Sequence, residues 1–116
     1  MGNTHNYLLS IPLNIDDLNH IPEGVLWEDI KFEDFMITKG DYDNLFNLFY
    51  RFNKCFDILI DEYEEEEISS DKIQSAIEMT EMYAANASAD VKASAEKLLV
   101  ALRRAKELNK PLELMF

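Results

Sequence analysis

Apolar and polar residues alternate in the stretch YLLSIPLNI near the N-terminus, at residues 7–15. A period of two is typical of a strand that buries one of its faces, so the pattern predicts a strand here. Pro12 has no N–H group to donate to a neighbouring strand. The strand is therefore expected either to lie at the edge of a sheet or to break at Pro12.

A second alternation of apolar residues occurs at residues 30–37, in the stretch IKFEDFMI. Its phase shifts by one residue in the middle, which is what an extra residue in a strand produces. The pattern predicts a short strand with a bulge around residues 33–34. A short helix near residues 22–29 is the alternative.

The apolar period becomes helical after Gly40, and Asp41 is a suitable residue to cap the first N–H groups of a helix. Large apolar residues then recur at intervals of three and four and form one stripe. The members of this stripe are Leu45, Phe49, Phe52, Phe56, Leu59 and Tyr63. The spacing predicts a long first helix over residues 41–66.

Two more helices are predicted at residues 70–86 and 89–109, because serines suited to capping precede apolar stripes in both segments. Pro111 cannot continue the last helix. The alternating end of the chain, PLELMF, predicts a final strand whose natural partner is the N-terminal strand. We therefore expect a single α+β domain over residues 1–116, with three helices packed on a small sheet of N-terminal and C-terminal strands. An all-α bundle is the alternative.

The net charge is −12, which is large for 116 residues. The charge is also uneven, because residues 91–116 hold six of the eleven basic residues and only three of the 23 acidic ones. Such a field repels nucleic acids and anionic membranes and attracts basic proteins. The chain is therefore expected to bind neither nucleic acid nor membrane.

Residues that usually carry chemistry are scarce. Three glycines form no phosphate-binding loop, and two histidines with one cysteine show no zinc-ligand spacing. No serine lies in a nucleophile elbow. We predict no catalytic, cofactor-binding or metal-binding residues, and we do not expect an enzyme. A lone cysteine and the lack of a leader-like N-terminus favour a cytoplasmic location.

The most unusual stretch is DILIDEYEEEEISSD at residues 57–71, in which eight of fifteen residues are acidic. At the C-terminal end of a helix these acids would oppose the helix dipole, so helix stability does not explain them. They form either a solvated helix end or connector, or a surface for a basic partner. The predicted partner-binding residues are Asp57, Asp61, Glu62, Tyr63, Glu64, Glu65, Glu66 and Glu67.

In its size, its negative charge and its lack of catalytic motifs, the chain resembles the class of bacterial immunity proteins. Such proteins block a toxin, often a basic nuclease, and the resemblance implies a toxin inhibitor that acts by binding. Two alternatives use other features. A nucleic-acid mimic would use the carboxylates in place of phosphates. An assembly subunit or homodimer would use Phe46, Tyr50 and Ile58, which lie off the main stripe of the first helix.

Overall fold

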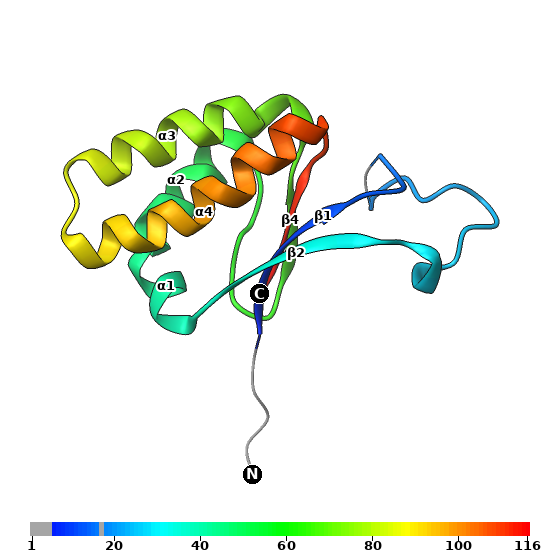
Figure 1. Cartoon of the computed structure of the whole chain (residues 1–116), viewed down its shortest axis with the longest axis horizontal. Helices are drawn as coiled ribbons and strands as arrows, with labels where there is room; N and C mark the ends of the chain where they lie inside the picture. Colours follow the sequence, from blue (N-terminus) through cyan, green and yellow to red (C-terminus); the bar gives the residue numbers. More distant parts are fainter. Residues whose placement is uncertain (1–5, 17) are drawn as a thin grey trace, which may run out of the picture.

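The computed structural model describes residues 6–16 and 18–116, and it has an α+β fold, as predicted from the sequence (Figure 1). The strands are β1 (Tyr7–Pro12), β2 (Phe32–Ile37), β3 (Glu65–Ile68) and β4 (Leu112–Met115). The helices are α1 (Lys39–Asn44), α2 (Phe46–Phe56), α3 (Ile73–Ala85) and α4 (Ala89–Leu108). Two 3₁₀ turns lie at Trp27–Asp29 and Ser70–Lys72.

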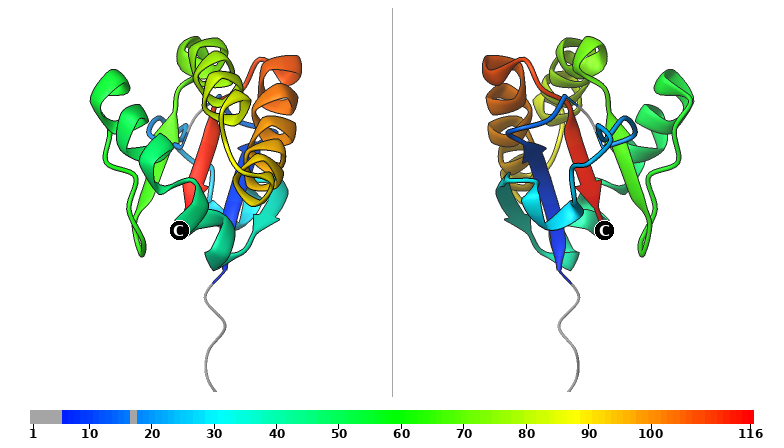
Figure 2. Two further views of the ribbon diagram at one scale, coloured as in Figure 1. Left: turned by 90° about the vertical axis from the view of Figure 1, so that its left-hand side faces the viewer. Right: turned by 90° about the vertical axis from the view of Figure 1, so that its right-hand side faces the viewer.

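The four strands form one antiparallel sheet in the order β2-β1-β4-β3. The predicted pairing of the N-terminal strand with the C-terminal strand is confirmed, since Leu9 lies opposite Leu114. The helices cover one face of this sheet, and the connector between β1 and β2 passes over the other face (Figure 2). Helix α4 contacts β1, β2 and β4, while α3 packs on α4 and α2 on α3.

The core lies between the sheet and these helices. Every second residue of β1 and β4 faces it, and these side chains are almost completely buried, as the alternation predicts. The helices contribute their apolar stripes from the other side. The largest fully buried side chains of the core include Leu9, Ile11, Leu45, Leu48, Phe49, Phe52, Leu98, Leu99, Leu102 and Leu112.

The predicted single helix over residues 41–66 is wrong, because the structure has two shorter helices, α1 and α2, that are separated at Leu45, and α2 does not continue beyond residue 56. Helix α2 ends at Asp57, which adopts a left-handed conformation with φ 55°, and the N–H of Ile58 donates to the carbonyl of Asn53 at 3.2 Å. Aspartate tolerates this conformation better than most residues. The apolar stripe holds through Phe56, which packs against the core and stacks on Phe52, but Leu59 is 63% exposed. Leu59 has the spacing of the helical stripe, but it lies beyond the end of the helix.

Strand β1 ends at Pro12, so the alternative in which the strand breaks there is correct. It is not an edge strand, because β2 and β4 flank it. The predicted bulge in β2 is wrong, since β1 and β2 pair one residue to one residue along their length. The phase of the pattern changes because Phe32 faces away from the helices and packs against the ring of Trp27, at a centroid distance of 5.8 Å. The two faces of β2 are both partly apolar.

The other two helices start and end close to the predicted residues. A 3₁₀ turn forms the beginning of the segment predicted as helix 70–86, and α3 follows it. Helix α4 begins after Ser88, whose Oγ accepts a hydrogen bond from the N–H of Val91. It ends at Asn109, which has φ 56°, a conformation common at helix C-termini.

A buried polar cluster joins α1 to α4. The carboxylate of Asp41 accepts hydrogen bonds from the Oγ of Ser94 at 2.7 Å and from the Nζ of Lys97 at 2.7 Å. Asp41 also forms a capping box with Thr38, because each side chain accepts from the backbone N–H of the other. Burial by itself would raise the pKa of Asp41, but hydrogen bonds from Lys97, Ser94 and Thr38 outweigh it and lower the pKa to about 2.

Candidate partner-binding surface

The structure divides the predicted acidic surface into a turn and a strand. Residues 57–64 form the turn that leads from α2 toward the sheet, and Glu65 begins β3. Backbone hydrogen bonds tie the end of this turn to the end of β4. The N–H of Tyr63 donates to the carbonyl of Phe116 at 2.9 Å, and the N–H of Phe116 donates to the carbonyl of Glu64 at 3.2 Å. The turn is therefore a fixed part of the fold.

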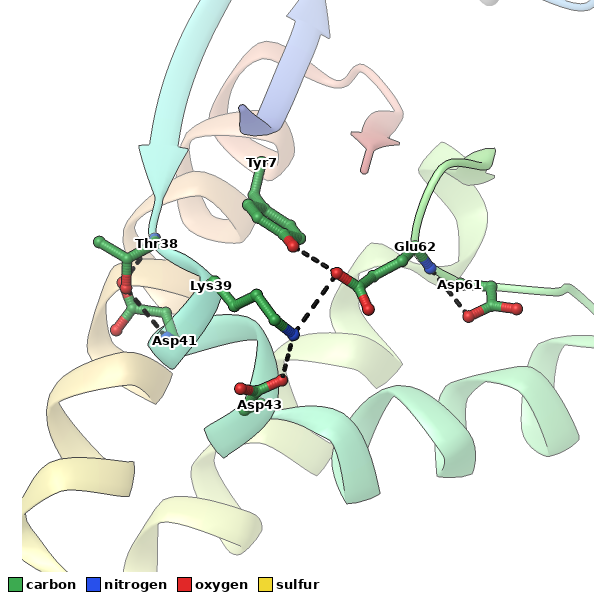
Figure 3. A network of polar contacts seen from close by, with 7 residues as sticks. All are labelled: Tyr7, Thr38, Lys39, Asp41, Asp43, Asp61 and Glu62. Atoms are coloured by element: carbon green, nitrogen blue, oxygen red, sulfur yellow. Dashed lines mark hydrogen bonds and ion pairs between the residues drawn. The ribbon is translucent and has the colours of Figure 1, made fainter. Parts of the chain in front are cut away.

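Glu62 lies in a polar network inside this framework (Figure 3). Its carboxylate accepts a short hydrogen bond from the hydroxyl of Tyr7 and lies 3.5 Å from the Nζ of Lys39. Lys39 also pairs with Asp43 at 3.1 Å. The hydrogen bond from Tyr7, followed by the positive charge of Lys39, lowers the pKa of Glu62. Glu62 thus joins the turn to β1 and α1, and its charge is already compensated.

The same network raises the pKa of Tyr7. The hydrogen bond to Glu62, together with burial, raises the pKa of Tyr7 to about 12. We expect Glu62→Gln to shift one tyrosine titration, followed by ultraviolet absorbance, back toward its ordinary value of about 10. Glu64→Gln, a change of an exposed neighbouring acid, should leave the titration unchanged. Identical titration curves for the wild type and Glu62→Gln would contradict this assignment.

The direction of the pKa shift of Tyr7 also determines how its hydrogen bond affects folding stability as the pH changes. Because the pKa is higher in the folded protein than in the unfolded chain, the stabilisation is fully present below pH 10. It is lost as the pH rises through about 12, where the folded protein releases the proton.

The acids of β3 differ: backbone N–H groups hold the carboxylate of Glu66, Glu65 is exposed, and one carboxylate oxygen of Glu67 is buried with no hydrogen-bond partner among the described residues. The carboxylate of Glu66 accepts from the N–H of Leu59 at 2.8 Å and from the N–H of Glu67 at 2.9 Å. Glu65 and Glu67 point to the other face of the sheet, where Glu67 lies opposite Glu113. Strand β3 is at the edge of the sheet, and charged side chains on an edge strand oppose pairing with another chain.

Three acids of the turn remain without compensation. Asp57, Asp61 and Glu64 are exposed, and no lysine or arginine among the described residues forms an ion pair with any of them. Between Asp61 and Glu64, Tyr63 is 77% exposed and has a left-handed backbone conformation with φ 63°. Of the predicted binding residues, these three acids, Glu65 and the ring of Tyr63 are therefore exposed.

An apolar groove lies beside these acids, between α2 and the turn. Its cavity volume is about 280 Å³. Three large apolar side chains in it are unusually exposed: Phe46 at 52%, Tyr50 at 54% and Leu59 at 63%. The residues that line the groove are Phe46, Phe49, Tyr50, Asn53, Leu59, Ile60 and Asp61.

The sequence contains only a partial signal for this groove. Phe46 and Tyr50 lie off the buried stripe of α2, which marks them as candidates for contact with another molecule. Leu59 continues the helical spacing, so the sequence predicts a core position for it and does not indicate the opposite wall of the groove. Ile58 and Ile60, a β-branched pair two residues apart, were the local signal for extended chain at this point.

The wall that carries Leu59 is held in place from two sides. The side chain of Asn53 on α2 accepts from the N–H of Ile60 at 2.7 Å and donates to its carbonyl at 3.3 Å. The carboxylate of Glu66 binds the N–H of Leu59 from the side of β3. The groove is consequently formed before any partner arrives.

Within residues 6–16 and 18–116, no group of three or more histidine, cysteine, aspartate or glutamate side chains is arranged to hold a metal ion. Among the same residues, no helix combines the length and apolarity needed to cross a bilayer. Comparison with protein-family models, with curated proteins and with solved structures gives no match to this chain.

Proposed function

We propose that this protein is a small acidic binding module that inhibits a basic partner protein, in the manner of a bacterial immunity protein that neutralises a toxin in the cytoplasm. The observation that carries the proposal is the set of uncompensated carboxylates on the turn. Asp57, Asp61 and Glu64 are held on a fixed backbone and have no cationic partner in the described chain. A basic partner would supply the missing charges.

The distribution of charge supports the same proposal. Other ion pairs neutralise acids elsewhere, such as Arg103 with Glu81 and Arg104 with Glu33. Exposed acids such as Asp90 and Glu96 also form no ion pair within the described chain, but the turn carries three such acids within eight residues, beside an exposed tyrosine. Charge clusters of this kind raise the rate of association with an oppositely charged protein and select among partners. The exposed ring of Tyr63 adds an aromatic contact of the type that often carries binding energy.

The test has two stages. The tagged protein is first used as bait in an extract of its native cells, and any stoichiometric basic protein that it retains is purified. The association rate of the purified pair is then measured at low and high salt. We expect the triple variant Asp57→Asn, Asp61→Asn and Glu64→Gln to lower the low-salt association rate by about tenfold, because long-range attraction is lost.

A matched variant separates local charge from total charge. Glu78→Gln, Asp90→Asn and Glu96→Gln remove the same number of charges from exposed positions on α3 and α4. We expect this variant to keep most of the association rate. Equal losses in both triple variants would show that only net charge matters, and a rate that ignores both salt and the turn would overturn the proposal.

A further inference from the structure

We propose that the groove between α2 and the turn is the anchor site for this partner, and that it takes one large apolar side chain from a segment whose flanking residues are lysine or arginine. This inference rests on the proposed function, because it specifies what part of a basic partner is bound. The proposed function needs only charge attraction to the acidic residues, and the inference adds an apolar contact to it.

The size of the groove favours a side chain over a free ligand. A volume of about 280 Å³ lies just below the range of about 300–1,000 Å³ that encloses most small-molecule ligands. The lining is mainly apolar, and it includes the rings of Phe46, Phe49 and Tyr50. An aromatic or aliphatic side chain that enters would cover the exposed parts of Phe46, Tyr50 and Leu59 and remove their apolar surface from water.

The charges around the groove specify what flanks the anchor. Asp61 is part of the lining, Asp57 lies two residues before Leu59, and neither has an ion-pair partner within the described chain. Two cations lie nearby: Lys39 is paired with acids, whereas Lys54 keeps its positive charge, because contact with an aromatic ring neutralises no charge, and this one charge opposes two acids. Lys39 pairs with Asp43 and Glu62, and Lys54 lies 4.8 Å from the centroid of the Tyr50 ring. The rim is therefore complementary to an apolar residue that has cations beside it.

The groove also has the rigidity that an anchor site needs. Asn53 and Glu66 fix the backbone of residues 59–60 on opposite sides, and Phe52 of α2 is fully buried in the core. A preformed site spends little free energy on ordering its own side chains and loops when it binds. The exposed apolar side chains therefore form a stable depression in the surface.

The inference is tested with synthetic peptides, followed by amide chemical shifts of the isotope-labelled full chain. The first peptide has one phenylalanine between flanking lysines, the second replaces the phenylalanine with alanine, and the third replaces the lysines with glutamates. We expect the first peptide to shift the amides of α2 and of residues 59–61. The second should bind about tenfold more weakly, because it lacks the anchor, and the third should not bind measurably.

Protein variants complete the test. Leu59→Ala should weaken binding of the phenylalanine peptide by about fivefold or more, and it should not change the fold because the side chain is 63% exposed. Met82→Ala, which removes a 75% exposed side chain on α3, is the matched control and should bind normally. The ratio of phenylalanine-peptide to alanine-peptide affinity should fall toward one in Leu59→Ala alone.

Three results would overturn the inference. If the two lysine peptides bind equally well at the turn, the acids bind cations without an anchor, and the proposed function would stand while the groove has no role. If neither lysine peptide binds, the groove does not recognise this chemistry. If the same amides shift with protein concentration in the absence of peptide, and Leu59→Ala stops this, the occupant is a second copy of the chain.

Discussion

Phe52→Ala is expected to lower the free energy of unfolding by about 3–5 kcal/mol, which is the usual cost of deleting a buried phenylalanine ring. The side chain of Phe52 is 0% exposed. Its ring lies between those of Phe49 and Phe56, at centroid distances of 6.2 Å and 5.4 Å. The loss would take away much of the total stability of a small domain, which is about 5–15 kcal/mol.

The measurement is equilibrium unfolding in urea, followed by far-ultraviolet circular dichroism. The control is Phe46→Ala on the same helix, whose side chain is 52% exposed. This control should cost less than about 1 kcal/mol, since most of its surface is already in water. A Phe52→Ala variant as stable as Phe46→Ala would contradict the packing of α2 on the core.

Asp41→Asn is expected to lower the free energy of unfolding by about 2–3 kcal/mol at neutral pH, the scale of losing charged hydrogen bonds in a buried cluster. The variant keeps the size of the side chain but removes the negative charge that faces Lys97. The hydrogen bond from Ser94 is also weakened, because its acceptor is no longer ionised. The contact between α1 and α4 therefore loosens.

This substitution should also change the dependence of stability on pH. The pKa of Asp41 is about 2 in the folded protein against an ordinary value of 3.8, so the wild type keeps this stabilisation above pH 3.8. The wild type loses this stabilisation as the pH falls toward about 2, where the carboxylate of Asp41 in the folded protein binds a proton. We expect that part of the acid dependence to be missing from unfolding curves of Asp41→Asn.

Asp43→Asn is the matched control for this effect. Asp43 lies two residues away in α1, its side chain is 58% exposed, and its pair with Lys39 spans one helical turn. Exposed pairs of this kind contribute only a few tenths of a kcal/mol. If both variants lost the same stability and kept the same acid dependence, the cluster of Asp41, Ser94 and Lys97 would not have the strength assigned to it.

For the acidic surface, the local sequence pattern predicts the location but not the conformation. The stretch at residues 57–67 was recognisable as a binding candidate from its composition alone. Its conformation was not, because Glu65, Glu66 and Glu67 have low preference for strands. Strand β3 forms because Ile68 pairs with Leu112 and is buried with it, and this contact joins residues more than forty positions apart. Local propensity contains no trace of such a pairing.

For a related reason, the sequence indicated only the α2 side of the groove. Its two walls come from α2 and from the turn, and they meet only because Asp57 ends the helix and Asn53 folds the turn back against it. Tertiary structure also removes Glu62 from the set of candidate binding residues. This glutamate is part of the same acidic run, yet the fold places it against Tyr7 and Lys39, so its charge serves the structure.

The sequence by itself determined the α+β class, the two long C-terminal helices, and the pairing of the first strand with the last. The helices and the two terminal strands follow from periodic burial of apolar residues within single segments, and the pairing of these strands follows because an apolar strand at the end of the chain needs a partner. Tertiary structure alone decided where the first long helix ends, that β3 exists, and which carboxylates remain uncompensated. Those outcomes depend on contacts between distant residues, whose free energy exceeds the small preferences of the local chain.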